Sequence, residues 1–215
     1  MYIFICENSP IGILTGVYDA WSLKIEKNCS HADIFLLSEQ PDNYELFNEF
    51  YTVNPSPIKT EKVASTLRRK LGQDFYDKIL SAILAVELSS KKKMDKANAV
   101  YQTIVTALHS PHGAKVLEHL GNPYIYRVFE LSRATASEAH HLKGFLRFSE
   151  LKNGILFSRI HPKNNACQSW QSTLRTVFLR KTFLFMMKTM ILLHSIVPEV
   201  TISLQTLPGS IRSFS

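Results

Sequence analysis

Between residues 58 and 133, hydrophobic side chains recur every three to four positions, and this pattern constrains the fold more than any other feature of the chain. The series Val63, Leu67 and Leu71 is one example, and Ile104 followed by Leu108 is another. A repeat of this length places apolar side chains on one face of an α-helix. Pro/Gly-containing breaks at 111–113 and 121–123 divide the segment. The middle of the chain is therefore predicted to be a group of packed helices.

The N-terminal segment has a different pattern. Residues 2–6 are β-branched or aromatic and predict a strand, and the apolar run at 34–37 predicts a second one. Between them, Asn8 or Ser9 is positioned to cap a helix whose apolar face repeats at helical spacing. That face consists of Ile13, Val17, Ala20 and Trp21. Breakers at 40–43 and 54–57 enclose a mixed aromatic stretch.

A last helix is predicted from Tyr124 to His141, ending at Gly144. Residues 145–151 and 155–160 then alternate between apolar and polar, and an Asn-Gly turn at 152–154 joins them. This predicts a β-hairpin in which Phe145 and Phe148 lie on opposite strand faces. Taken in chain order, the elements predict an α+β fold with an N-terminal strand–helix–strand, central helices and a C-terminal β-hairpin.

Composition excludes several classes. Of 215 residues, 45% are hydrophobic, which is too many for a disordered chain. The three Cys lack a Cys-x-x-Cys spacing, so no metal site and no cofactor is evident, and unpaired Cys suit a reducing cytoplasm. Residues 1–6 lack a basic segment and a cleavage site. Lys181 and Lys188 interrupt the apolar residues near 183–197, well short of the ~18 that a membrane span needs. We expect a cytoplasmic protein without a membrane segment.

The block from Glu138 to Leu151, with Gly154 to Pro162 after it, carries a resemblance. It is similar to the long signature of a bacterial family of DNA metabolism proteins, itself a domain of unknown function. Residues 11–21 also resemble the start of that family. The resemblance covers residues 1–165 loosely and 128–165 tightly. It implies a role in DNA repair or modification beside a radical-SAM protein and a uracil-DNA-glycosylase-like protein, which are the expected partners.

The same block contains the candidate site residues. Lys143 and Arg147 are candidates for phosphate contacts, and Gly144 would let a ligand approach the backbone. Glu138 with His140 or His141 is a candidate acid–base pair, and only Glu138 and His141 are spaced to face each other on a helix. Ion pairing at a helix end remains an alternative. His161 adds a fourth group without a metal-binding spacing.

Two further basic clusters lie on helical segments, at 68–70 and at 91–93 with Lys96. Such runs are usually solvated helix faces, and they are also suited to phosphate contacts, which need charge and reach more than exact geometry.

Residues 167–215 do not follow the family. A legal back-translation of 167–182, read one base earlier, spells a segment similar to the family's continuation, which favours a single-base frameshift near Ala166. A divergent C-terminus is the alternative. The domain prediction is therefore 1–166 for the family domain and 167–215 for the out-of-frame or divergent tail. The tail holds five Lys/Arg and one acid, so residues 1–166 account for only +3 of the net charge of +7.

Three classes of function remain open. The first is an accessory protein that acts on DNA with its partners. The second is an enzyme that processes a nucleotide or base with Glu138, His140 and Lys143, and the third is a scaffold that holds a partner. Convergence of Glu138, His140, Lys143 and Arg147 in one pocket would favour catalysis.

Overall fold

A computed structural model describes residues 1–41, 46–86, 94–145, 149–150, 156–159, 183–186, 190–194 and 205–206. The chain divides into two compact units, Met1–Ala136 and Ser137–Ser215. The predicted α+β fold is confirmed, because the helices occur together with two separate sheets.

The first unit contains a three-stranded parallel sheet formed by β1 (Tyr2–Ile5), β2 (Ile34–Leu37) and β3 (Glu49–Thr52), in the order β2-β1-β3. Both outer strands pair with β1, and Phe4 lies opposite Leu36 on one side and Tyr51 on the other. The strand at 49–52 lies in the aromatic stretch that was not predicted as a strand. Its four residues are too few for a periodic signal, and its pairing partner is more than forty residues away in sequence.

Helix α1 (Pro10–Lys27) follows β1 after a short turn. Ser9 caps it, with its hydroxyl accepting a hydrogen bond from the Gly12 amide at 3.0 Å, as predicted for this position. Asn28 ends the helix in the left-handed conformation, and the short helix η1 (His31–Asp33) leads into β2. The helix lies close to the sheet, because a Cβ at Gly16 would overlap the Cys6 sulfur.

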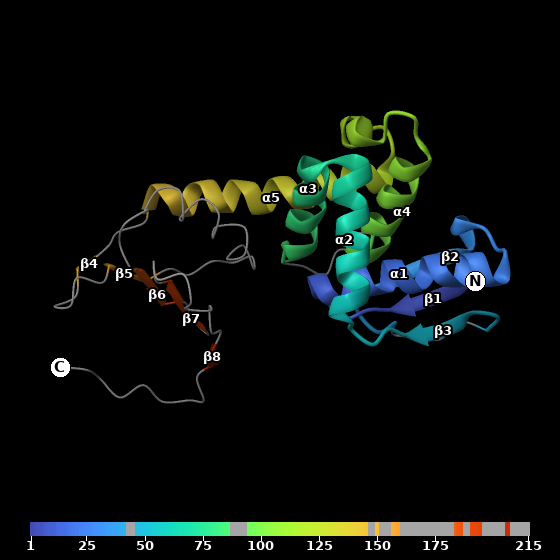
Figure 1. Cartoon of the computed structure of the whole chain (residues 1–215), viewed down its shortest axis with the longest axis horizontal. Coiled ribbons are helices and arrows are strands. Elements are labelled where there is room, and N and C mark those ends of the chain that lie inside the picture. The colour runs from blue at the N-terminus through green and yellow to red at the C-terminus, as the bar shows by residue number, and fades with distance from the viewer. Residues whose placement is uncertain are drawn as a thin grey trace. The chain divides into compact units, whose positions relative to one another are not determined.

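The remaining helices are α2 (Pro57–Leu71), α3 (Gln73–Leu84), α4 (Lys96–His109), the short η2 (Gly113–Glu118) and α5 (Pro123–Phe145). These match the helical segments that the periodicity predicts. Within the first unit, α1 and α4 pack on β2 (Figure 1). Their buried side chains form one core, whose largest fully enclosed members include Tyr101, Phe75, Ile13, Leu36, Leu67 and Ile104.

The last helix ends one residue later than predicted, and the predicted strand start at Phe145 is wrong. Gly144 lies inside α5, and Phe145 is its last residue rather than the first residue of a strand. Extending an existing helix adds one hydrogen bond per residue, and a single glycine costs only ~1 kcal/mol, which is too little to end it. Phe148, which the prediction places on the opposite strand face from Phe145, lies outside the described residues.

The second unit contains a five-stranded sheet in the order β4-β5-β6-β7-β8. β4 (Ser149–Glu150) pairs antiparallel with β5 (Leu156–Arg159), which confirms the hairpin over a shorter range than predicted. The other strands are β6 (Phe183–Met186), β7 (Met190–His194) and β8 (Gln205–Thr206). β5 pairs with β6 in parallel, and the last two pairs are antiparallel.

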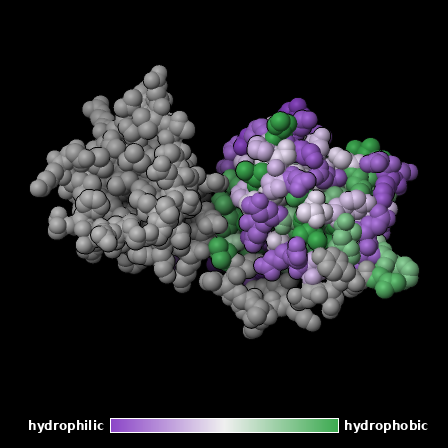
Figure 2. Space-filling model, turned by 90° about the horizontal axis from the view of Figure 1, so that it is seen from below, coloured by the Kyte–Doolittle hydropathy of each residue, from purple (hydrophilic) through white to green (hydrophobic). Residues whose placement is uncertain are grey.

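The face of the first unit in Figure 2 is largely hydrophilic, with its hydrophobic residues in separate spots. Scattered apolar side chains are normal on the surface of a water-exposed protein. Among the residues that the structure describes, no helix combines the length and the apolar character that crossing a membrane requires.

Candidate functional site

The first unit contains a groove between α1 and α2. Both helices start at the same edge of the sheet, because each follows the carboxyl end of a parallel strand. The start of α2 is tied to the middle of α1: the Ser56 amide donates to Thr15 Oγ1 at 3.0 Å, and Lys59 Nζ lies 2.7 Å from Asp19 Oδ1. Beyond these contacts the helices diverge, and α4 lies behind them (Figure 1). The space left between the diverging helices has a volume of about 350 Å³.

Helix α1 supplies one wall of this α1–α2 groove. Its lining residues have the spacing i, i+1, i+4, i+5 and i+8, which is one face of a helix. Tyr18 and Trp21 are the large aromatic side chains of this wall. The wall consists of Val17, Tyr18, Trp21, Ser22 and Ile25.

Helix α2 supplies the other wall, and Ile104 and Leu108 of α4 complete the groove. The interior is apolar, because Leu67, Ile104 and Leu108 line it, while the exposed Lys62 and Lys70 carry its charge. The α2 wall consists of Lys62, Val63, Thr66, Leu67 and Lys70.

Helix α2 is strongly basic, with five Lys/Arg and the single acid Glu61. Arg68 pairs with Glu61 at 3.2 Å and Lys59 pairs with Asp19, so these charges are partly compensated. Within the part of the chain that the structure describes, the other three basic residues make no salt bridge. Positions i, i+7 and i+8 share one helix face, and we call Lys62, Arg69 and Lys70 the basic face of α2.

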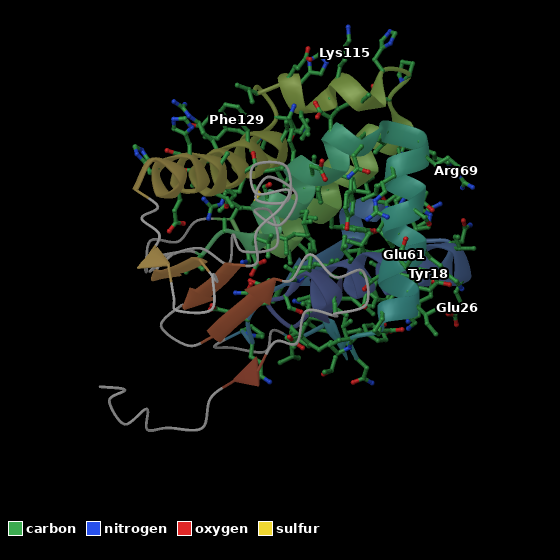
Figure 3. The ribbon with its side chains drawn as sticks, turned by 60° about the vertical axis from the view of Figure 1, so that its left-hand side comes forward. Tyr18, Glu26, Glu61, Arg69, Lys115 and Phe129 are labelled. Carbon is green, nitrogen blue, oxygen red and sulfur yellow. The ribbon has the colours of Figure 1, made fainter. Side chains whose placement is uncertain are left out.

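Tyr18 connects this basic face to the aromatic wall. Its ring lies under two ammonium groups, with the centroid 5.8 Å from Lys59 Nζ and 5.6 Å from Lys62 Nζ. Figure 3 shows Tyr18 at the boundary between α1 and α2, and Arg69 extending away from α2 into solvent. Cation–π contact of this kind holds the lysine heads near the groove opening.

Trp21 belongs to a cluster of aromatic and imidazole rings. Its ring centroid lies 4.6 Å from that of His31 and 6.2 Å from that of His109. His31 Nδ1 lies 2.7 Å from the hydroxyl of Tyr101, which is fully buried. Burial raises the pKa of Tyr101, so its hydroxyl stays protonated and shares a hydrogen bond with the imidazole. These contacts fix the Trp21 ring at the groove wall.

The same cluster makes His31 sensitive to pH. Burial lowers the pKa of His31, and the nearby His109 and Lys24 charges lower it further. Below the ordinary His pKa of ~6.5, the unfolded chain then binds more protons at this position than the folded chain. The free energy of unfolding should therefore fall as the pH drops through this range. It should fall less in His31→Asn, whose amide oxygen can still accept from Tyr101.

Urea unfolding at pH ~7.5 and ~5.5 measures this difference. His112→Gln, which removes an exposed imidazole, serves as the control and should behave as the wild type does. An equal loss of stability in wild type and His31→Asn would contradict the role of His31.

Cys6 lies beneath α1 and is buried. Burial, together with the Asp95 and Asp19 charges, raises the pKa of this thiol to about 12. A thiol with so high a pKa is protonated at neutral pH and is a poor nucleophile.

The sequence-predicted site residues lie elsewhere, on α5 and beyond it. His140 and His141 are exposed, and their ring centroids lie 6.4 Å apart. Glu138 is half-buried on the same helix, and α5 also contains Lys143 and Gly144. Arg147 and His161 lie outside the described residues. The acid–base and phosphate roles of these residues stay predictions.

One residue of the predicted basic cluster at 91–93 with Lys96, namely Lys96, does not lie on a solvated face. Lys96 is only 3% exposed, and its Nζ donates to the carbonyls of Ile83 and Ala85, both at 2.9 Å. Its partners at 91–93 lie outside the described residues. The cluster at 68–70 does lie on an exposed face of α2.

A family model described as a domain of unknown function, DUF4130, matches residues 94–204. Since this is more than half of the 215 residues, the chain belongs to that family. No curated protein matches the chain. The matched range contains segment 128–165, which carries the tight resemblance. It also runs past residue 166 and so includes both sides of the predicted domain boundary. That boundary stays a prediction. The α1 and α2 walls of the groove precede the matched residues, and α4 lies within them.

The sequence reasoning did not identify the groove. It placed Trp21 on the apolar face of its helix, and it described residues 68–70 as a solvated basic run that is also suited to phosphate contacts. One signal was present: Lys62, Thr66 and Lys70 form a polar row at four-residue spacing beside the apolar Val63 and Leu67. Such a row on a half-buried helix marks the edge of a groove, but it does not reveal which helix forms the opposite wall.

Proposed function

We propose that this chain is a nucleic-acid-binding accessory protein of DNA metabolism, and that it holds DNA through the basic face of α2. The observation that carries the proposal is the absence of a salt bridge to Lys62, Arg69 or Lys70 among the described residues, on a helix with five basic residues and one acid. Uncompensated cations grouped on one face attract phosphates and release their counterions.

The side-chain types on this face suit the role. Arg69 can bind a phosphate through two parallel hydrogen bonds, and Lys62 and Lys70 act as point charges on flexible stems. Contacts to phosphate position a nucleic acid without reading its sequence. The proposal therefore concerns affinity and makes no claim of sequence specificity.

The DNA-metabolism part of the proposal rests on the similarity of residues 138–151 to the bacterial family described above. On the same basis, we propose that the chain acts beside a radical-SAM protein and a uracil-glycosylase-type activity. In this arrangement the chemistry belongs to the partners, and this chain contributes binding.

The double variant Arg69→Gln, Lys70→Gln tests the proposal. It should bind a labelled 20-nucleotide single strand about 10-fold more weakly at ~0.1 M salt, because two phosphate contacts are lost. The slope of log K against log salt should also become shallower by about 1.4. Fluorescence anisotropy at several salt concentrations measures both quantities.

The control is Lys78→Gln, Lys115→Gln, which removes the same charge from exposed residues of α3 and η2 (Lys115 is labelled in Figure 3). If this pair weakens binding as much as the α2 pair, net charge rather than the basic face is responsible. The variant Lys143→Ala, Arg147→Ala in the same assay tests the contacts that the sequence motif predicts.

A further inference from the structure

We infer that the α1–α2 groove binds one nucleotide of single-stranded DNA, with the base inside the groove and the phosphates at Lys62 and Lys70. This inference deepens the proposed function and rests on it. It adds a particular site, a preference for unpaired strands and a role for residues of α1, which lie outside the basic face.

The size and lining of the groove carry the inference. Its volume of about 350 Å³ lies at the lower end of the range for small-molecule pockets, which suits a single ring system rather than a large ligand. The interior is apolar, and Tyr18 and Trp21 contribute aromatic rings. Aromatic and apolar walls hold a nucleobase by stacking without selecting its identity.

The charges around the groove commit it to an anionic occupant. Lys62 and Lys70 are two turns apart on α2, about 12 Å along the helix axis, so they lie toward opposite ends of the groove. No acid lines the groove as the structure describes it, and Asp19 of α1 and Glu61 of α2 are paired with Lys59 and Arg68. A base alone would fill the apolar interior and leave the ammonium groups of Lys62 and Lys70 without an anion. A nucleotide within a strand fills the interior and also brings phosphates to both ammonium groups.

Polar groups at the opening are compatible with a base edge. Ser22 Oγ donates to the Tyr18 carbonyl at 3.1 Å, and Thr66 Oγ1 donates to the Lys62 carbonyl at 2.7 Å. With their protons committed, both hydroxyl oxygens keep lone pairs that can accept from an N–H group of a base, such as N3–H of thymine.

Filling the groove tests the inference. Ser22→Phe places a ring in the opening from an exposed position and leaves every charge in place. Its affinity for a 20-nucleotide thymidine strand should fall about 5- to 100-fold, the loss of one stacked base. Its affinity for a duplex of the same length should stay as in the wild type. The matched control is Ser132→Phe on α5, whose hydroxyl also donates to a carbonyl one turn earlier, at 3.0 Å.

A second readout reports the groove directly. With Trp170→Phe, Trp21 is the only tryptophan, and its emission should be quenched by the single strand but not by the duplex. Thr66→Phe fills the groove from α2 and should match Ser22→Phe, which guards against a folding defect in either variant.

The outcomes separate the two proposals. If Ser22→Phe and Thr66→Phe keep wild-type affinity for the single strand, the groove does not bind a nucleotide, and the basic face stands if Arg69→Gln, Lys70→Gln still weakens binding. If the wild type binds neither DNA form, the proposed function fails and the inference fails with it. If an acidic helical peptide changes the emission of Trp21 and single-stranded DNA does not, the groove binds a protein partner and the inference is overturned.

Discussion

Replacing Lys96 with methionine should lower the free energy of unfolding of the first unit by about 2–4 kcal/mol. The Lys96 ammonium donates to the carbonyls of Ile83 and Ala85 at the C-terminal end of α3, where no further helical turn supplies donors. Methionine keeps the length of the side chain but leaves both carbonyls without this partner in a buried place. Burial lowers the pKa of Lys96, so removing the buried charge brings some gain in stability. We expect the loss to exceed this gain, because the ammonium makes two hydrogen bonds.

Urea unfolding followed by Trp21 emission in the Trp170→Phe background measures this loss. Lys78→Met is the matched control, because Lys78 is an exposed residue of α3, and its replacement should change stability by no more than ~0.5 kcal/mol. Equal stability of Lys96→Met and Lys78→Met would show that the buried ammonium does not support the end of α3.

The second large effect is expected at Gly16, where α1 packs closely against Cys6 and Leu36. Gly16→Ala should cost about 1–3 kcal/mol, because the added methyl group overlaps the Cys6 sulfur and approaches Leu36 Cδ2 at 3.3 Å. This loss arises even though alanine forms helices better than glycine by ~1 kcal/mol. Gly121→Ala should have little effect, since a Cβ there meets nothing within 4 Å.

A double-mutant cycle isolates the contact. Cys6→Ala removes the sulfur that the new methyl group would meet, so Cys6→Ala, Gly16→Ala should be more stable than the sum of the single effects predicts. Strict additivity of the two changes in unfolding free energy would contradict the close approach of α1 to β1.

Much of the fold could be predicted because its signals are local. Ser9 caps α1 as expected, and the strands at 2–5 and 34–37 stand out by their β-branched and aromatic residues. Strand 49–52 escaped prediction because only pairing with β1, far away in sequence, makes it a strand. The predicted strand start at Phe145 was wrong because α5 continues one residue past Gly144, and extending a helix that already exists is cooperative.

The candidate groove could not be predicted for a related reason. Periodicity shows that Trp21 and Leu67 face inward on their helices, but the angle between α1 and α2 decides whether that interior is filled or open. Trp21 therefore looked like a core residue, while the contacts with His31 and His109 that fix its ring come from segments ten and eighty-eight residues later. Only the charge of α2 was visible in advance.

The salt dependence of single-strand binding by the wild-type chain tests the central claim most directly. Three phosphate contacts by Lys62, Arg69 and Lys70 predict that log K falls with log salt with a slope of about −2 for a 20-nucleotide strand. A slope near zero, or no binding at ~50 mM salt where such contacts are strongest, would contradict a DNA-binding role for the basic face of α2.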